Sequence, residues 1–166
     1  MAETIATVAN VALALSLVVG LIFGIAQVRA ASRDRKERLT LEALRNFQSR
    51  EFVELMHYIT FHDPPRNSED MRALPERDQV AFVQFSQAME MLGMLVAESM
   101  IDIDLVEKTL GSFVFTTWER FKPFALSLRS TDPFLNEYFQ WLAERISERM
   151  SRRPRRPFYE TEWRRR

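Results

Sequence analysis

The chain has 166 residues, 46% of them hydrophobic, and its 23 basic and 23 acidic side chains give a formal net charge of zero. It contains no cysteine, which excludes disulfides, thiolate metal sites and thiol nucleophiles. Without its apolar N-terminal segment it retains roughly 135 residues, the size of one domain and too few for two well-buried cores.

The zero net charge is a cancellation between segments of opposite sign. Residues 29–50 carry seven bases against three acids, residues 51–148 carry eight against seventeen, and residues 149–166 carry eight against two. An acidic middle segment therefore lies between two basic ones.

Residues 5–28 form a run of 24 residues without a charged side chain, and a basic segment follows from Arg29. As a helix rising about 1.5 Å per residue, the run measures roughly 36 Å, enough to cross a hydrocarbon core of about 30 Å with some tilt. Only Glu3 and the amino terminus carry charge before the run, and basic residues favour the cytoplasmic side. The pattern predicts one transmembrane helix with its N-terminus outside.

A cleaved secretory signal peptide is the alternative interpretation of this segment, because residues 28–30 loosely resemble a small-residue cleavage site. Signal peptides usually have a basic residue before an apolar run of about 7–15 residues. This run is longer and no basic residue precedes it. The pattern therefore favours a permanent anchor.

Small residues recur every four positions within the apolar run, at Ala12, Ser16, Gly20 and Gly24. On a helix they form one stripe, and membrane helices associate where small residues let their backbones approach closely. The stripe predicts a contact face for another transmembrane helix, either from a second copy or from a different subunit. Chance spacing is the alternative, since small residues are frequent in membrane spans.

No glycine or proline occurs between Gly24 and Pro64, so we expect the membrane helix to continue as a basic stalk helix to residue 60. Apolar residues from Leu41 to Ile59 follow the spacing of an amphipathic helix. Residues 61–75 contain three prolines and are expected to form a loop.

Three further helices are predicted downstream. Residues 79–100 should form the central core helix, with an inward face of Phe82, Phe85, Met89, Leu92, Val96 and Met100. Gln84, Gln87, Glu90, Met94 and Glu98 would form a solvated or partner-facing edge of the same helix.

The next helix should start with a capping box of Asp104 and Glu107, and Pro123 should break or kink it. Its inward face would carry Val106, Leu110, Phe113, Trp118 and Phe121. Asp132 and Pro133 have the pattern of a helix start, and the last helix would bury Leu135, Tyr138, Phe139, Leu142 and Ile146.

These patterns predict an all-α protein with four parts. A single N-terminal transmembrane helix (1–28) continues into a basic juxtamembrane stalk (29–60). A bundle of three or four helices follows (61–150), and an arginine-rich tail ends the chain (151–166).

Few side chains suggest chemistry. Glu54 and His57 have the Glu-x-x-His spacing of metal-binding bundles, and Glu90 could join them, but a full site needs a second such pair and further glutamates. Neither a nucleophile elbow nor a glycine-rich phosphate loop is present in the sequence. We therefore predict no catalytic residue, no metal and no cofactor.

The C-terminal arginines are interleaved with aromatic residues, and they include Arg152, Arg153, Arg155, Arg156, Arg164, Arg165 and Arg166. Anionic lipid is the first interpretation, because a basic residue near such a leaflet contributes on the order of 1 kcal/mol. Docking onto an acidic protein surface and an idle solvated tail are the alternatives. Nucleic acid is disfavoured because the acidic middle segment would repel its phosphates.

Four segments resemble an uncharacterised bacterial family: residues 85–93, 101–106, 118–123 and 139–144. Its members have a single N-terminal membrane span and a compact helical domain of unknown function. The resemblance covers about half of the chain, implies the architecture derived above and carries no catalytic residue.

The leading hypothesis for function is a single-pass protein of the bacterial inner membrane, with a cytoplasmic domain that acts as an accessory or scaffolding subunit by binding. A membrane-bound enzyme or metal-binding bundle using Glu54, His57 and Glu90 is the first alternative. A sensor or signalling adaptor that acts through the stalk is the second.

Overall fold

The computed structural model describes residues 1–152, 154 and 160, and for seven residues near the N-terminus it describes the backbone alone: Ala2, Glu3, Ile5, Ala6, Val8, Val11 and Ala12. Within the described residues the chain is all-α and contains no strand, as predicted. It divides into two compact units, residues 1–39 and residues 40–166. The second unit is called the helical domain below.

Helix α1 runs from Ala2 to Asn46, so the expected N-terminal apolar helix is confirmed and extends into the basic segment. Large apolar side chains are exposed along it, for example Leu17 at 76% and Phe23 at 70%. Its last residues, from Thr40 onward, belong to the helical domain, where the Thr40 hydroxyl accepts a hydrogen bond from the Asp102 amide at 2.8 Å.

The predicted stalk is not one helix to residue 60, because α1 ends at Asn46 and α2 runs from Arg50 to Phe61. Neither glycine nor proline makes the break. The Ser49 hydroxyl accepts a hydrogen bond from the Phe52 amide, which caps the new helix, and the rings of Phe47 and Phe52 pack edge to face at 4.6 Å.

The predicted loop of residues 61–75 contains a short helix, α3, from Ser68 to Ala73. Asn67 caps it by accepting hydrogen bonds from the Glu69 and Asp70 amides. The expectation of a loop throughout was wrong because this cap provides a helix start among the loop-forming residues.

Helix α4 runs from Glu76 to Ala97, three residues earlier than predicted at both ends. Five of its six expected core residues are buried: Phe82, Phe85, Met89, Leu92 and Val96. The sixth, Met100, lies beyond the end of the helix and is 45% exposed.

Helix α5 runs from Ile103 to Leu128, and its cap differs from the predicted one. Asp102 caps the helix by accepting from the Asp104 amide at 2.7 Å. Asp104 and Glu107 instead form ion pairs with Arg149 of the last helix. Pro123 does not end the helix, because it lies on the exposed side, where water can reach the carbonyl that loses its partner.

Helix α6 runs from Glu137 to Arg152, so it starts later than Asp132 and extends into the segment predicted as tail. Asp132 instead stabilises the turn before α6, where its carboxylate accepts a hydrogen bond from the Phe134 amide at 3.1 Å. Of the five residues predicted to be buried, Phe139, Leu142 and Ile146 are fully buried and the other two are half-buried.

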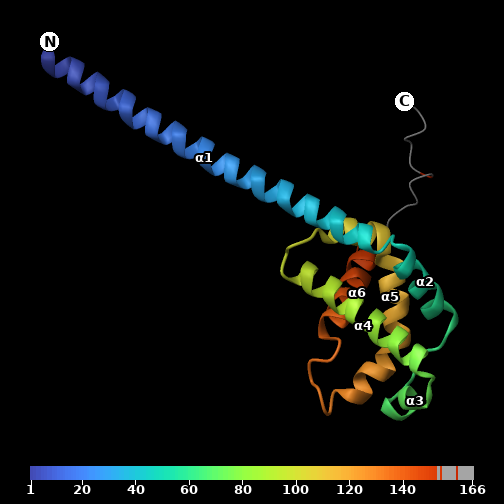
Figure 1. Ribbon diagram of the computed structural model, residues 1–166. Helices are drawn as coiled ribbons and strands as arrows, with labels where there is room; N and C mark the ends of the chain where they lie inside the picture. The colour runs from blue at the N-terminus through green and yellow to red at the C-terminus, as the bar shows by residue number, and fades with distance from the viewer. Residues whose placement is uncertain (153, 155–159, 161–166) are drawn as a thin grey trace. The chain divides into compact units, whose positions relative to one another are not determined.

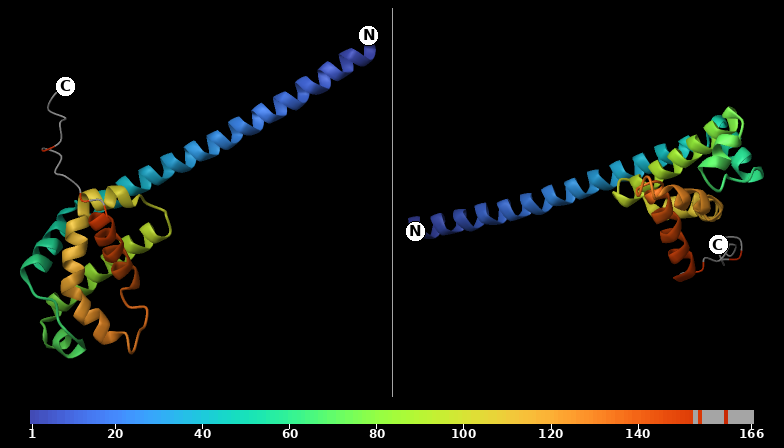
Figure 2. Two further views of the ribbon diagram at one scale, coloured as in Figure 1. Left: turned by 180° about the vertical axis from the view of Figure 1, so that it is seen from behind. Right: turned by 90° about the horizontal axis from the view of Figure 1, so that it is seen from below.

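Figures 1 and 2 show α4, α5 and α6 packed together in the helical domain, with α2 beside α4. Aromatic side chains from the three helices fill the centre. Phe85 of α4 contacts Phe121 of α5 at 5.2 Å between ring centroids and Phe139 of α6 at 6.0 Å, and Trp118 contacts Phe139 at 5.1 Å. The core therefore joins three elements distant in sequence.

Candidate functional site

The start of α6 is held tightly against α4. Both Glu90 carboxylate oxygens accept hydrogen bonds from the first turn of α6, from the Tyr138 amide at 3.2 Å and the Phe139 amide at 2.8 Å. A Cβ on Gly93 would lie only 2.2 Å from the Tyr138 carbonyl oxygen, so glycine allows this close approach. Glu90 therefore has a capping role within the domain, and its placement on a solvated or partner-facing edge was wrong.

The other two candidate metal ligands, Glu54 and His57, lie on α2 and make contacts of their own. Glu54 is exposed and pairs with Arg50 at 2.8 Å on the same helix, and the exposed His57 ring lies 4.7 Å from the ring of Phe61. Among the described residues, no group of three or more histidine and carboxylate side chains could hold a metal ion.

The opposite side of α4 exposes a surface that is uncharged except at its two ends. Successive residues on this side are Val80, Gln84, Gln87, Ala88, Met91 and Leu95, with Arg77 at one end and Glu98 at the other. We call these eight residues the outer α4 face. Val80 is 57% exposed and Met91 is 55% exposed, so apolar side chains face solvent within the acidic segment of residues 51–148. The sequence indicated this edge through Gln84, Gln87 and Glu98, and it missed Val80 and Met91.

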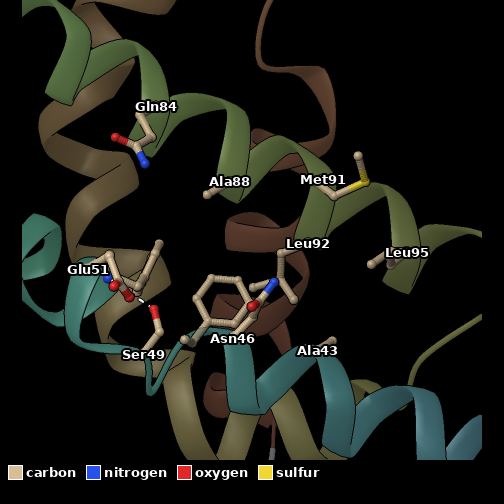
Figure 3. A pocket seen from close by; sticks show the side chains of 11 residues that line it. Ala43, Asn46, Ser49, Glu51, Gln84, Ala88, Met91, Leu92 and Leu95 are labelled. Atoms are coloured by element: carbon tan, nitrogen blue, oxygen red, sulfur yellow. Dashed lines mark hydrogen bonds between the residues drawn. The ribbon is translucent and has the colours of Figure 1, made fainter.

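A pocket of about 300 Å³ borders the outer α4 face (Figure 3). Ala43 and Asn46 from the end of α1, together with Ser49 and Glu51, form one wall, and Gln84, Ala88, Met91, Leu92 and Leu95 of α4 form the other. Phe47 and Phe52 complete the lining. The pocket is a recess beside an exposed helix, which suits an inserted side chain of a protein partner.

The predicted stripe of small residues lies in the first unit. A Cβ on Gly20 or Gly24 would meet no atom within 4 Å, so both positions are open to a neighbouring helix. Ser16 is exposed, and the side chain of Ala12 lies outside the described residues. The contact itself stays a prediction.

The predicted arginine surface is only partly described. Arg152 is exposed on the last turn of α6 and pairs with Glu148 at 2.6 Å, whereas Arg153, Arg155, Arg156, Arg164, Arg165 and Arg166 lie outside the described residues. Arg149 forms ion pairs within the domain, with Glu107 and Asp104, and these pairs join α6 to α5. The hydrogen bond to Glu107 is the largest cause of the raised pKa of Arg149.

Two segments in the described part of the chain are long and apolar enough to cross a membrane: residues 13–46 and α4. No residue in the apolar 18-residue stretch of the first segment is buried, whereas one third of the residues in the corresponding stretch of α4 are buried. The fully buried Phe82, Phe85 and Met89 place α4 in the core of the helical domain. The N-terminal segment is therefore the better candidate for a membrane span.

Comparison with known protein families gives a match over most of the chain. A family model described as "Domain of unknown function (DUF4760)" matches residues 14–146, which include residues 14–28 of the apolar run, the outer α4 face and the start of α6. No curated protein and no solved structure matches the chain. Because the match covers most of its length, the chain belongs to the DUF4760 family of domains of unknown function.

Proposed function

We propose that the protein is a single-pass inner-membrane protein with its N-terminus outside and its helical domain in the cytoplasm, and that it acts as a scaffolding subunit. Its first partner is a second copy of the same chain. The outer α4 face carries this proposal, because an exposed surface with an uncharged, partly apolar centre and charged ends is typical of a binding surface.

The order of residues on the outer α4 face supports a symmetric pair. If two copies of α4 pack antiparallel about a two-fold axis between Gln87 and Ala88, Arg77 of each copy faces Glu98 of the other, and Val80 faces Leu95. These charges are 21 positions apart, roughly 31 Å along the helix. A parallel pair would place like charges together, which is unfavourable.

The neighbouring pocket also suits this arrangement. In the antiparallel pair, Met91 of the second copy would face Gln84, whose side chain lines the pocket in Figure 3. An unbranched methionine side chain adapts to irregular recesses of this kind. The pocket would then receive part of the partner helix.

The absence of native cysteine permits a clean crosslinking test in native membranes. A single cysteine at Gln87, next to the proposed axis, should give disulfide-linked dimers on mild oxidation. Lys108→Cys, exposed on α5 and outside the face, is the matched control. Equal dimer yields at the two positions, or no dimer at Gln87, would overturn the proposed pairing.

A charge swap tests the antiparallel orientation. Arg77→Glu and Glu98→Arg should each weaken dimerisation in a crosslinking titration, and the double variant should restore it because both ion pairs re-form with reversed sign. Exposed pairs contribute up to about 1 kcal/mol each. Additive loss in the double variant would exclude the arrangement.

The stripe in the membrane helix supplies a second contact, and we expect the C-terminal arginines to add contacts with anionic lipid. Replacing both Gly20 and Gly24 with Leu should weaken assembly in lipid because backbones could no longer approach closely. Replacing Leu17 and Leu21 with Ile, adjacent in the span and similar in volume, is the control. Unchanged assembly of the glycine variant would remove the intramembrane contact.

A further inference from the structure

A second groove lies along α4, between this helix, the start of α6 and the turn that joins α5 to α6. Its volume of about 740 Å³ is within the range of small-molecule sites. Most of its lining is apolar and includes Phe82, Met94, Phe124, Leu128 and Phe134. The groove shares Met91 with the pocket of Figure 3, and its other lining residues differ from those of that pocket.

Asn136 brings an unusual polar group to this groove. It immediately precedes α6, its φ is 54°, and it is only 4% exposed. Asparagine at a helix start ordinarily caps its own helix. The Glu90 carboxylate already accepts from the Tyr138 and Phe139 amides, which leaves the Asn136 side chain available for other contacts.

The two ends of the Asn136 amide differ in their partners. Its Oδ1 accepts a hydrogen bond from the Ser86 hydroxyl at 2.6 Å. Its Nδ2 is buried and has no hydrogen-bond partner among the described residues. A buried donor without an acceptor is unfavourable, and a bound molecule that offers an acceptor would satisfy it.

We propose that this groove binds an uncharged amphiphile, such as a long-chain alcohol or amide. The ligand oxygen accepts a hydrogen bond from Asn136 Nδ2, and the alkyl chain lies against the apolar walls. The carboxylates of Glu90 and Asp132, which also line the groove, disfavour an anionic head group.

Photolabelling of the full chain in phospholipid nanodiscs tests the site. A photoreactive long-chain alcohol should label groove residues such as Met94 and Phe134, as mapped by mass spectrometry. Excess 1-decanol should suppress this labelling, whereas decanoate, of equal chain length but negatively charged, should suppress it much less. Equal suppression by the two competitors would overturn the proposed chemistry. Labelling of residues 5–28 through the bilayer serves as the internal reference.

Two variants separate binding from folding. Asn136→Asp keeps a residue that tolerates positive φ but removes the donor, and loss of one hydrogen bond should lower the affinity about fivefold. Val83→Trp obstructs the groove from a position that is 46% exposed, and Leu126→Trp, 47% exposed on α5 and outside the groove, is its control. Unchanged groove labelling in both Asn136→Asp and Val83→Trp would overturn the proposal.

The source of the ligand is distinguished by a second probe. A diacylglycerol, which is an uncharged lipid, with a photoreactive acyl chain and incorporated in the nanodisc, should label the groove if the bilayer supplies the ligand. Groove labelling by the free alcohol alone would identify a soluble amphiphile. Either result supports the site, and labelling by neither probe contradicts it.

Discussion

Phenylalanine and glycine occur in both units of the chain and have different surroundings in each. Phe23 of the N-terminal helix is 70% exposed, whereas Phe85 of α4 is fully buried among three other rings. A Cβ on Gly24 would meet nothing, whereas one on Gly93 would collide with the α6 backbone. The helical domain buries much of its apolar surface internally, and the N-terminal helix needs lipid or another helix to do so.

Truncating the two phenylalanines should show this difference most strongly. Phe85→Ala should destabilise the helical domain by about 3–5 kcal/mol, because it removes a buried ring and leaves a cavity. Phe23→Ala should leave domain stability unchanged. Urea unfolding followed by the fluorescence of Trp118 and Trp141, both in the domain, measures the effect. A similar loss in the Phe23 variant would show that the two units are energetically coupled.

Adding one methyl group to the glycines should give the next largest contrast. Gly93→Ala should cost about 2 kcal/mol, since displacement of the Tyr138 backbone outweighs a gain in helix propensity of about 1 kcal/mol. Gly111→Ala is the internal control, because its Cβ would lie 3.4 Å from Ile146 Cγ2, at ordinary contact distance. It should be neutral or slightly stabilising. Chemical denaturation of the two variants compares them, and equal destabilisation would contradict the close approach of α6.

Neutralising Glu90 should have a smaller effect on the same interface. Glu90→Gln keeps an acceptor for the first turn of α6 but loses the negative charge that favours a helix N-terminus, and should cost about 1 kcal/mol. Glu119→Gln, exposed on α5, should cost almost nothing. The difference between their thermal midpoints at neutral pH gives the result, and equal midpoints would argue against a cap.

The smallest expected difference between the two units is in how their stability responds to alkaline pH. Burial raises the pKa of Tyr58 above its ordinary value of 10.0, and its hydrogen bond to Asp78 adds to the rise, whereas Arg77 opposes it. The folded domain thus favours the neutral phenol, so this contribution is complete below pH 10 and is lost as the pH rises through the folded pKa. Tyr58→Phe should reduce the alkaline loss of domain stability. Residues 5–28 contain no titratable side chain and should not respond.

Local patterns in the sequence predicted the apolar helix and the inward face of α4, because both depend on residues within one helix. Phe82, Phe85 and Met89 recur at helical spacing, so their burial was predictable. The break before α2 was missed because it depends on the Ser49 cap rather than on glycine or proline.

The positions that join distant helices could not be predicted in the same way. Glu90 and Gly93 had the pattern of an ordinary helix, and their roles depend on Tyr138, more than forty residues later. Asp104 and Glu107 matched a capping box, but their carboxylates pair with Arg149 of another helix. The buried Asn136 Nδ2, which has no hydrogen-bond partner among the described residues, likewise depends on how α4 and α6 meet.

The contact of α6 with both α4 and α5 also has a consequence during synthesis. Helix α6 follows the helices that it covers, and its first turn is capped by a residue of α4. On the ribosome, the aromatic faces of α4 and α5 emerge before the helix that shields them, while the apolar N-terminal helix emerges earlier still. The nascent chain therefore passes through a period of exposed aromatic surface, when premature self-association is its main hazard and a chaperone would be most effective.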